Sequence, residues 1–503
     1  MSFLIVLAAL AFLMLAAYRG YSVILFAPIA ALGAVLLTDP GAVAPVFSGI
    51  FMEKLVGFVK LYFPVFLLGA VFGKLIEISG FSESIVVAAI RYIGRTRANA
   101  VIVLVCALLT YGGVSLFVVV FAVYPFAAEL YRQSNIPKRL MPGAIALGAF
   151  SFTMDTLPGT PQIQNIIPTT FFKTTGWAAP WLGVIGSVAM LTAGLIYLEW
   201  RRRTVMATGE GYGGSAAEAD AKADANTGAN ADANTGANAD ANTGTNAGAK
   251  ADNLPIAPLP AKRGLPHPLL SIAPLVLVGV VNFALTKMIP HWYGDNYALT
   301  ADALPGLHSA INLPIKGVIG IWAVEGALLL GIVFVVVTAF GRVRAAFAEG
   351  TKAAVGGALL AAMNTASEYG FGGVIAALPG FLAVSSALKS VPDPLINAAV
   401  SVTTLAGITG SASGGMSIAL AAMSDQFIRA AESAQIPLEV LHRVVSMASG
   451  GMDTLPHNGA VITLLAVTGL THKQSYGEIF GITVIKTLAV FFVIAVYYLT
   501  GLV

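Results

Sequence analysis

An acidic residue, a hydroxyl and a proline occur together twice in this chain, each time inside a long apolar stretch. Residues 154–158 and 452–456 both read Met-Asp-Thr-Leu-Pro. Because proline interrupts a helix and Asp or Thr can cap its resumption, each copy predicts a broken helix. Asp155 and Asp453 are candidates either to carry a coupling proton or to cap the broken backbone. Burial disfavours the ionised carboxyl group and raises its pKa, whereas capping N–H donors favour the ionised form and lower the pKa. The two roles therefore predict opposite pKa shifts.

Glycines and serines gather at two other places, where pairs of short apolar arms meet. These are Gly112-Gly113-Val114-Ser115 and Ser411-Ala412-Ser413-Gly414-Gly415. Glycine lets backbone approach a ligand, and backbone N–H groups at hairpin tips and helix breaks favour a carboxylate. The alternative is that small residues only let helices pack closely in a membrane. The predicted substrate-binding residues are Gly112, Gly113, Ser115, Thr156, Thr160, Ser411, Ser413, Gly414, Gly415, Ser417, Thr454, His457 and Asn458.

Further titratable residues fall in or near apolar segments. Glu368 stands in a polar cluster with Thr365 and Ser367. Since charges inside membrane spans are functional candidates by default, we assign Glu368 to proton coupling or gating. Glu325 belongs to a span that we expect to be scaffold, and His457 breaks the symmetry of the two motifs, since the first copy has Gly159. His267, His291 and His308 fall in loops and have no metal-ligand spacing with acidic partners, so we expect no metal site.

The composition predicts the kind of element that must position these residues. The chain has 503 residues, of which 57% are hydrophobic and 11% charged, against about 25% charged in soluble domains. This favours an all-α polytopic membrane protein in the lipid bilayer. A net charge of +3 is too small to suggest a nucleic-acid partner. No nucleophile–base or metal constellation appears, so we expect no catalytic residues and no enzyme.

The apolar segments form two groups separated by a low-complexity stretch. We predict a first membrane repeat at 1–203, with a hairpin at 98–130 and a broken helix at 141–172. Residues 204–266 repeat Asp-Ala-Asn-Thr-Gly-Ala-Asn-Ala, which cannot bury enough apolar surface to fold, so they form a disordered linker. A second repeat follows at 267–503, with a hairpin at 394–430 and a broken helix at 442–470.

The two groups correspond in sequence, and their basic residues indicate opposite orientations. Gly80-Phe81, Asn99-Ala100 and Ile136-Pro137 recur as Gly380-Phe381, Asn397-Ala398 and Ile436-Pro437. Basic residues flank the first hairpin and are fewer beside the second, which places the hairpins on opposite sides of the membrane. Two inverted-topology repeats follow, with both termini outside and the linker cytoplasmic. Such repeats are typical of secondary transporters with a binding site at the membrane midplane.

These features resemble the ion transporter superfamily, and within it the gluconate:proton symporter (GntP) family, with citrate transporters as relatives. The resemblance rests on the two Gly/Ser hairpin tips and the two Met-Asp-Thr-Leu-Pro segments. It covers both membrane repeats but not 204–266. It implies proton-coupled uptake of an organic anion, a homodimer, a bacterial inner-membrane location and an elevator-like movement of the part that bears the hairpins.

We therefore expect a secondary active transporter that imports a small hydroxylated organic acid anion by proton symport, without a cofactor. Gluconate-like and 3-hydroxybutyrate-like acids both fit. A sodium-coupled citrate or dicarboxylate carrier is the near alternative, since broken helices bind sodium as well as anions. Against a polyanion, neither motif contains Arg or Lys. An organic anion channel is the second alternative, which saturable, gradient-dependent accumulation would exclude.

Overall fold

The structure is a computed structural model that describes residues 2–19, 21–94, 97–213, 264–300, 304–381, 391–456 and 458–503. Most of the predicted linker, at 214–263, lies outside the described residues, and so does His457.

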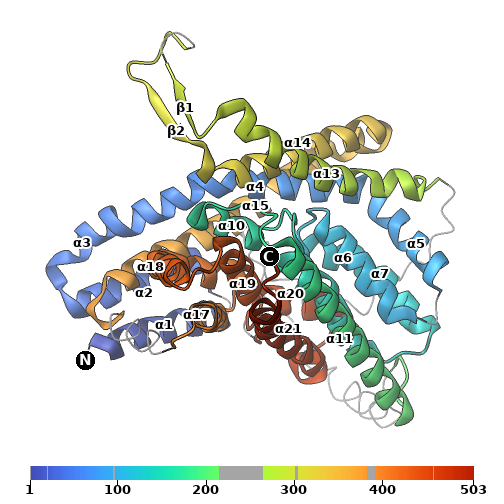
Figure 1. Cartoon of the computed structure of the whole chain (residues 1–503). Helices are drawn as coiled ribbons and strands as arrows, with labels where there is room; N and C mark the ends of the chain where they lie inside the picture. The colour runs from blue at the N-terminus through green and yellow to red at the C-terminus, as the bar shows by residue number, and fades with distance from the viewer. Residues whose placement is uncertain are drawn as a thin grey trace, which may run out of the picture.

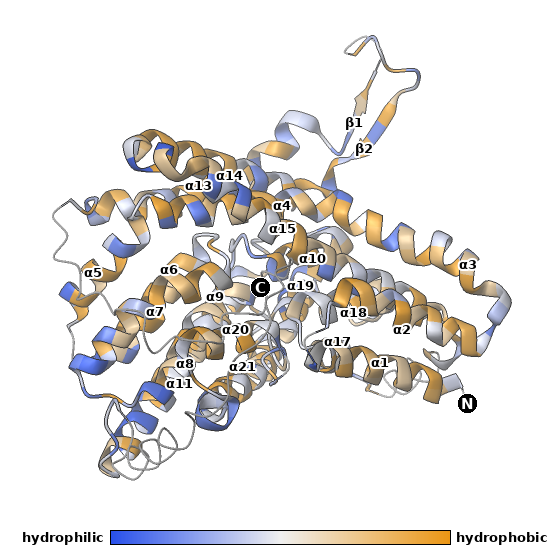
Figure 2. Cartoon of the chain, turned by 180° about the vertical axis from the view of Figure 1, so that it is seen from behind, coloured by the Kyte–Doolittle hydropathy of each residue, from blue (hydrophilic) through white to orange (hydrophobic). Residues whose placement is uncertain are grey.

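Long apolar helices make up almost all of the described chain. Five of the described helical stretches are long and apolar enough to cross a membrane: Pro40–Ile78, Pro180–Ala207, Pro268–Tyr293, Ile319–Thr338 and His472–Thr500. The fold is that of an all-α polytopic membrane protein, as predicted. Hydrophobic residues cover much of most helices, and hydrophilic ones concentrate near the ends of helices such as α7 (Leu116–Gln133) and α11 (Pro180–Ala207) (Figure 2). A short hairpin of β1 (Asn296–Leu299) and β2 (Ile311–Pro314) projects from one end (Figure 1).

One layer of long helices runs across the molecule. In it, α4 (Met52–Ile78) packs along α15 (Phe340–Ala377), and α13 (Pro268–Tyr293) packs on α14 (Ile319–Thr338), which also contacts α4 (Figure 1). Near the N-terminus, α1 (Ser2–Tyr18) packs on α2 (Val23–Thr38), and α2 contacts α15. The basic residues Arg342, Arg344 and Lys352 predict a loop on the inner side of the membrane, between spans at 316–340 and 353–378. Instead α15 is helical from Phe340, because the intervening Ala, Arg, Glu and Lys residues are strong helix formers.

Two helical hairpins lie on opposite sides of the centre of the molecule (Figure 1). The first joins α6 (Ala98–Tyr111) to α7, with α5 (Phe81–Ile93) beside it. The second joins α17 (Pro394–Thr409) to α18 (Ala412–Ser433). Each tip contains a glycine with positive φ, Gly113 at 96° and Gly410 at 64°, a conformation that other residues rarely adopt.

After each hairpin comes a broken helix. The first consists of α8 (Met141–Ala149), the single turn α9 (Phe152–Asp155) and α10 (Ile163–Phe172). The second consists of α19 (Leu438–Ser449) and α20 (Gly459–Thr468). The side chain of Asn458 caps α20 by accepting from Val461 N at 2.9 Å, whereas Asp155 ends α9 and does not begin α10. The cap of α20 is therefore Asn458 and not the aspartate of the motif.

The half-helices after the breaks are exchanged between the repeats. α10, from the first repeat, packs on α18 and α19 of the second. Reciprocally, α20 packs on α7 and α8 of the first. The final helices of the repeats, α11 and α21 (His472–Thr500), also pack together. This exchange brings the two breaks together near the centre of the molecule, where α19 contacts α9 and α10 (Figure 1). We call this place the crossing.

Candidate functional site

At the crossing, the aspartate of the first break lies against the second break. Asp155 is 1% exposed, and its Oδ1 accepts a hydrogen bond from Thr156 Oγ1 at 2.5 Å. Its Oδ2 has no hydrogen-bond partner within the described residues. A Cβ added to Gly450, the residue that follows α19, would lie 1.8 Å from this Oδ2. The two breaks thus meet through a carboxylate on one side and a glycine on the other.

A buried arginine of the second repeat fastens the first break in place. Arg443 lies on α19 with no exposed surface. Its Nη1 donates to Asn165 Oδ1 at 3.0 Å and to Asp155 O at 3.3 Å, and its Nε and Nη2 donate to Ala178 O at 3.1 and 2.7 Å. Nη2 also donates to Gly176 O at 3.4 Å. Since a guanidinium group has five N–H donors, Arg443 is fully engaged by the first repeat.

Two other residues of α19, His442 and Ser446, also hydrogen-bond to the first repeat. His442 Nδ1 lies 2.6 Å from Thr174 Oγ1, and Ser446 Oγ donates to Asp155 O at 2.7 Å. Ser446 Oγ also lies 3.0 Å from Gln164 O. Consequently, hydrogen bonds from one face of α19 fix the backbone of the first break on both sides of its irregular segment.

A lysine of the last helix connects the two breaks. Lys486, on α21, forms an ion pair with Asp453 Oδ1 and donates to Phe150 O, at the end of α8, at 3.1 Å. Both charged side chains are at least nine-tenths buried. Asp155 interacts electrostatically with Lys486, Asp453 and Arg443. The crossing therefore holds two acids and two bases whose formal charges cancel.

The tip of the second hairpin forms another polar cluster. Ser411 Oγ accepts from Gly414 N at 3.0 Å, and Ser413 Oγ lies 3.3 Å from Thr365 Oγ1 on α15. The Glu368 carboxylate packs on the same tip, since a Cβ added to Gly414 would lie 1.8 Å from Glu368 Oε2. Glu368 Oε2 and the hydroxyl groups of Ser367 and Ser417 are buried without a partner among the described residues. This cluster has spare acceptors and donors for a ligand or a cation.

The tip of the first hairpin has different surroundings. A Cβ added to Gly112 would lie 2.3 Å from Leu275 of α13, and one added to Gly113 would lie 3.1 Å from Leu328 of α14. Ser115 precedes α7 without making a side-chain capping bond. Here the small residues allow close packing against apolar side chains, which is the structural alternative that the sequence left open.

Each hairpin tip is tied to the break that follows it in sequence. Gln162 Nε2 donates to Thr110 O at 2.7 Å, and Asn458 Nδ2 donates to Gly410 O, also at 2.7 Å. The corresponding amides come from the residues just before α10 and α20. Hairpin and break are thereby held as one unit in each repeat.

The remaining predicted residues make local contacts. Thr160 Oγ1 donates to Thr153 O at 2.8 Å, and Thr454 Oγ1 lies 2.7 Å from Thr483 Oγ1 on α21. Gly415 lets the arms of the second hairpin approach, since its added Cβ would lie 2.2 Å from Ala406. Of the predicted set, Asp155, Thr156 and Asp453 come together at the crossing, and Ser411, Ser413, Gly414 and Glu368 come together at the second tip.

Sequence reasoning missed the two buried cations. The repeat offset of 298 residues pairs Arg443 with Ile145 and Lys486 with Val188, so a search for matched motifs passes over both. A signal was nevertheless present, because the apolar segment 479–501 predicts a last membrane span and Lys486 lies inside it. An intramembrane charge is a functional candidate. Both cations lie beside the motifs, which removes much of the earlier reason for disfavouring a polyanion.

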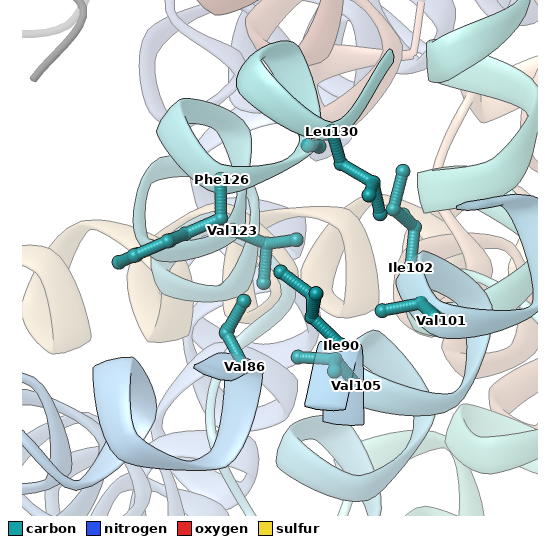
Figure 3. Close-up of a pocket in the computed structure, with 9 residues that line it drawn as sticks. Val86, Ile90, Val101, Ile102, Val105, Val123, Phe126 and Leu130 are labelled. Atoms are coloured by element: carbon teal, nitrogen blue, oxygen red, sulfur yellow. The ribbon is translucent and has the colours of Figure 1, made fainter. Parts of the chain in front are cut away.

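A small pocket elsewhere has no polar lining. It lies between α5, α6 and α7 and is enclosed by apolar side chains such as Ile90, Val105 and Phe126 (Figure 3). It offers no hydrogen-bond donor to an anion, so we do not assign it to binding. Across the described ranges, no group of three or more His, Cys, Asp or Glu side chains is arranged to hold a metal ion.

The chain was compared with known proteins. No family model matches it. Over 504 residues it is 56% identical to a curated Bacillus subtilis protein named uncharacterized transporter YxjC, with 100% of both chains covered. Among solved structures, it is similar to the YdaH transporter of Alcanivorax borkumensis, with a TM-score of 0.46 and 14% identity over 93% of this chain and 90% of that chain.

Proposed function

We propose a function from the premise that this chain belongs to the family of transporters that includes YxjC. It is a secondary active transporter that imports a small hydroxylated organic acid anion, gluconate-like or 3-hydroxybutyrate-like, by proton symport. The binding site is the crossing of the two breaks together with the tip of the second hairpin.

The charge balance at the crossing carries this proposal. Asp155 and Asp453 offset Arg443 and Lys486, and all four side chains are buried. A monocarboxylate that enters adds one negative charge, and an uncompensated charge in a buried site is strongly unfavourable. With both aspartates ionised, entry of the anion requires one cation to enter with it. The unpaired Oδ2 of Asp155 and the carboxylate of Asp453 are the places where a proton would bind.

Glu368 is the third proposed proton carrier. It lies on the second hairpin tip with Oε2 unpartnered in the described part of the chain, and the neighbouring groups are hydroxyls. A buried carboxylate in such surroundings needs a proton or another cation to offset its charge. Its position on α15, which belongs to the long-helix layer, suits a group that senses movement of the hairpin.

The mode of movement follows from how the hairpins are attached. Because Gln162 and Asn458 tie each tip to its break, hairpins and breaks move together against the layer of α4, α13, α14 and α15. This is an elevator-like movement. We propose that the transporter is a homodimer in a bacterial inner membrane, with both termini outside and 204–266 in the cytoplasm.

A sodium-coupled citrate or dicarboxylate carrier is the alternative. The presence of Arg443 and Lys486 at the crossing favours it, because polyanions attract such partners. Backbone carbonyls at the breaks would then hold sodium. An organic anion channel with no coupling ion is the second alternative.

Uptake by proteoliposomes separates these functions. Radiolabelled gluconate and 3-hydroxybutyrate are presented under an imposed proton gradient and, separately, under an imposed sodium gradient, to the parent chain and to Asp453→Asn. Saturable accumulation that follows the proton gradient and fails in the variant supports the proposal. Accumulation driven by sodium supports the alternative carrier, and flux without accumulation supports a channel.

A further inference from the structure

Lys486 occupies an unusual position for a charged residue. It lies within α21 and is 1% exposed, and its neighbours Ile485, Leu488 and Ala489 are apolar. From there its ammonium group reaches both breaks, contacting Asp453 of the second and Phe150 O of the first. A cation held between the two halves of a transport site is placed to respond to what enters it.

The two buried cations of the crossing differ in their freedom to bind a ligand. The donors of Arg443 all have acceptors in the first repeat. The Lys486 ammonium group has three N–H donors, and two acceptors contact it within the described ranges. Lysine is also a point charge on a flexible stem, whereas a guanidinium group is held by its fixed fork. Lys486 is therefore the cation that can exchange partners.

We infer that Lys486 binds the carboxylate of the transported anion and that Asp453 is the partner it gives up. The inference deepens the proposed function and rests on it. When the anion binds the ammonium group, Asp453 is left as a buried carboxylate without its cation. It then takes one proton from the aqueous phase at Oδ1. When the anion leaves, the proton leaves and the ion pair with Lys486 forms again.

The exchange couples one proton to one anion without a net change of buried charge. Before binding, Lys486 is paired with Asp453, and Arg443 donates to the backbone carbonyl of Asp155. After binding, Lys486 is paired with the substrate carboxylate and Asp453 is neutral. No other charged group has to move, because Arg443 remains fixed by its five hydrogen bonds.

The test compares two variants that differ only at Lys486. Lys486→Gln alone leaves Asp453 as an unpaired buried carboxylate and can fail to fold, so Lys486→Gln is made in the Asp453→Asn background. Exchange of radiolabelled gluconate and 3-hydroxybutyrate across proteoliposomes is measured with no ion gradient. Lys287→Gln, on the exposed side of α13, is the matched control. Thermal unfolding establishes that each variant is folded.

We expect Asp453→Asn to exchange the acids while losing accumulation on a proton gradient. The double variant should exchange the acids poorly. Relative to Asp453→Asn, the substrate concentration for half-maximal exchange should rise roughly tenfold or more, which corresponds to the loss of one charge-assisted hydrogen bond. If the folded double variant exchanges the acids at the same rate as Asp453→Asn, then Lys486 serves only to neutralise Asp453. In that case the inference is wrong and the proposed function still stands. If the parent exchanges neither acid, the proposed function fails and the inference fails with it.

Discussion

Asp155 Oδ2 lies against the backbone of Gly450, so that the acid of one repeat occupies the space that a side chain in the other would need. The same arrangement recurs at the second hairpin tip, where Glu368 Oε2 lies against Gly414. In both places a carboxylate oxygen that has no partner in the described part of the chain contacts a glycine of another element. Adding one methyl group to either glycine should therefore alter transport.

Gly450→Ala should disrupt the crossing. Its Cβ would lie 1.8 Å from Asp155 Oδ2, and the short Asp155 side chain has little freedom to withdraw. We expect a loss of about 1–3 kcal/mol in the free energy of unfolding and a severe loss of uptake. Thermal unfolding and proteoliposome uptake measure the two effects. Gly459→Ala is the control, since nothing lies within 4 Å of its added Cβ. Equal uptake by the two variants would contradict this view of the crossing.

Gly414→Ala should affect transport more than stability. Here the obstacle is the far end of the flexible Glu368 side chain, which can swing away at small cost. Uptake should fall because the carboxylate leaves the hairpin tip, while thermal unfolding should change little. Shortening the acid by Glu368→Asp in the Gly414→Ala background should recover part of the uptake. No recovery would mean that displacement of Glu368 is not the cause of the loss.

Arg443→Met should destabilise the fold. It would remove both arginine donors to Ala178 O, and a buried acceptor left unpaired costs about 1–3 kcal/mol. Asp155 O would keep Ser446 as a donor, and Gly176 O would keep Gly159 N and Asn165 Nδ2. We expect low yields of monodisperse protein and a large fall in the unfolding temperature. Arg344→Met, at an exposed position of α15, serves as the control. If Arg443→Met had the same unfolding temperature as the control, the hydrogen bonds of Arg443 would not be needed for stability.

An ionic cluster links the repeats at the far end of α11. Glu478 of α21 has a 2% exposed side chain and accepts from Arg201 Nη2 at 2.6 Å, while Arg139 Nη1 lies 3.7 Å away. Breaking a buried pair costs about 3–5 kcal/mol, so Glu478→Gln should lower the unfolding temperature markedly. Glu199 also pairs with two arginines, but its side chain is 36% exposed, and Glu199→Gln should cost less than about 1 kcal/mol. Similar unfolding temperatures for the two variants would contradict this ranking.

The duplicated motif was enough to predict that the chain contains paired helix breaks. Proline and glycine act locally, so the ends of α8, α10, α19 and α20 follow from short stretches of sequence. The polar cluster around Glu368 was also visible, because hydroxyl groups surround it within one apolar segment. Its contact with Gly414 was not, since that contact depends on how α18 packs on α15.

The residues that complete the crossing could not be predicted in the same way. Arg443 and Lys486 find partners in the first repeat because α10 and α20 are exchanged, and this exchange is a property of the whole fold. Neither residue has a charged counterpart in the first repeat. Symmetry therefore pointed to the backbone of the candidate site and to its two aspartates, while its two cations follow from packing.

The exchange of α10 and α20 also governs how the protein can be made. While the ribosome is still translating the segment between the repeats, α10 has neither α18 nor α19 to cover it. The carbonyl groups of Asp155 and Ala178 lack the donors that α19 will supply until that helix is synthesised. The first repeat must therefore wait in the membrane as an unfinished intermediate. Early termination of translation leaves a fragment for quality control to remove rather than a half-transporter, and two separately expressed halves should be stable only when they are made together.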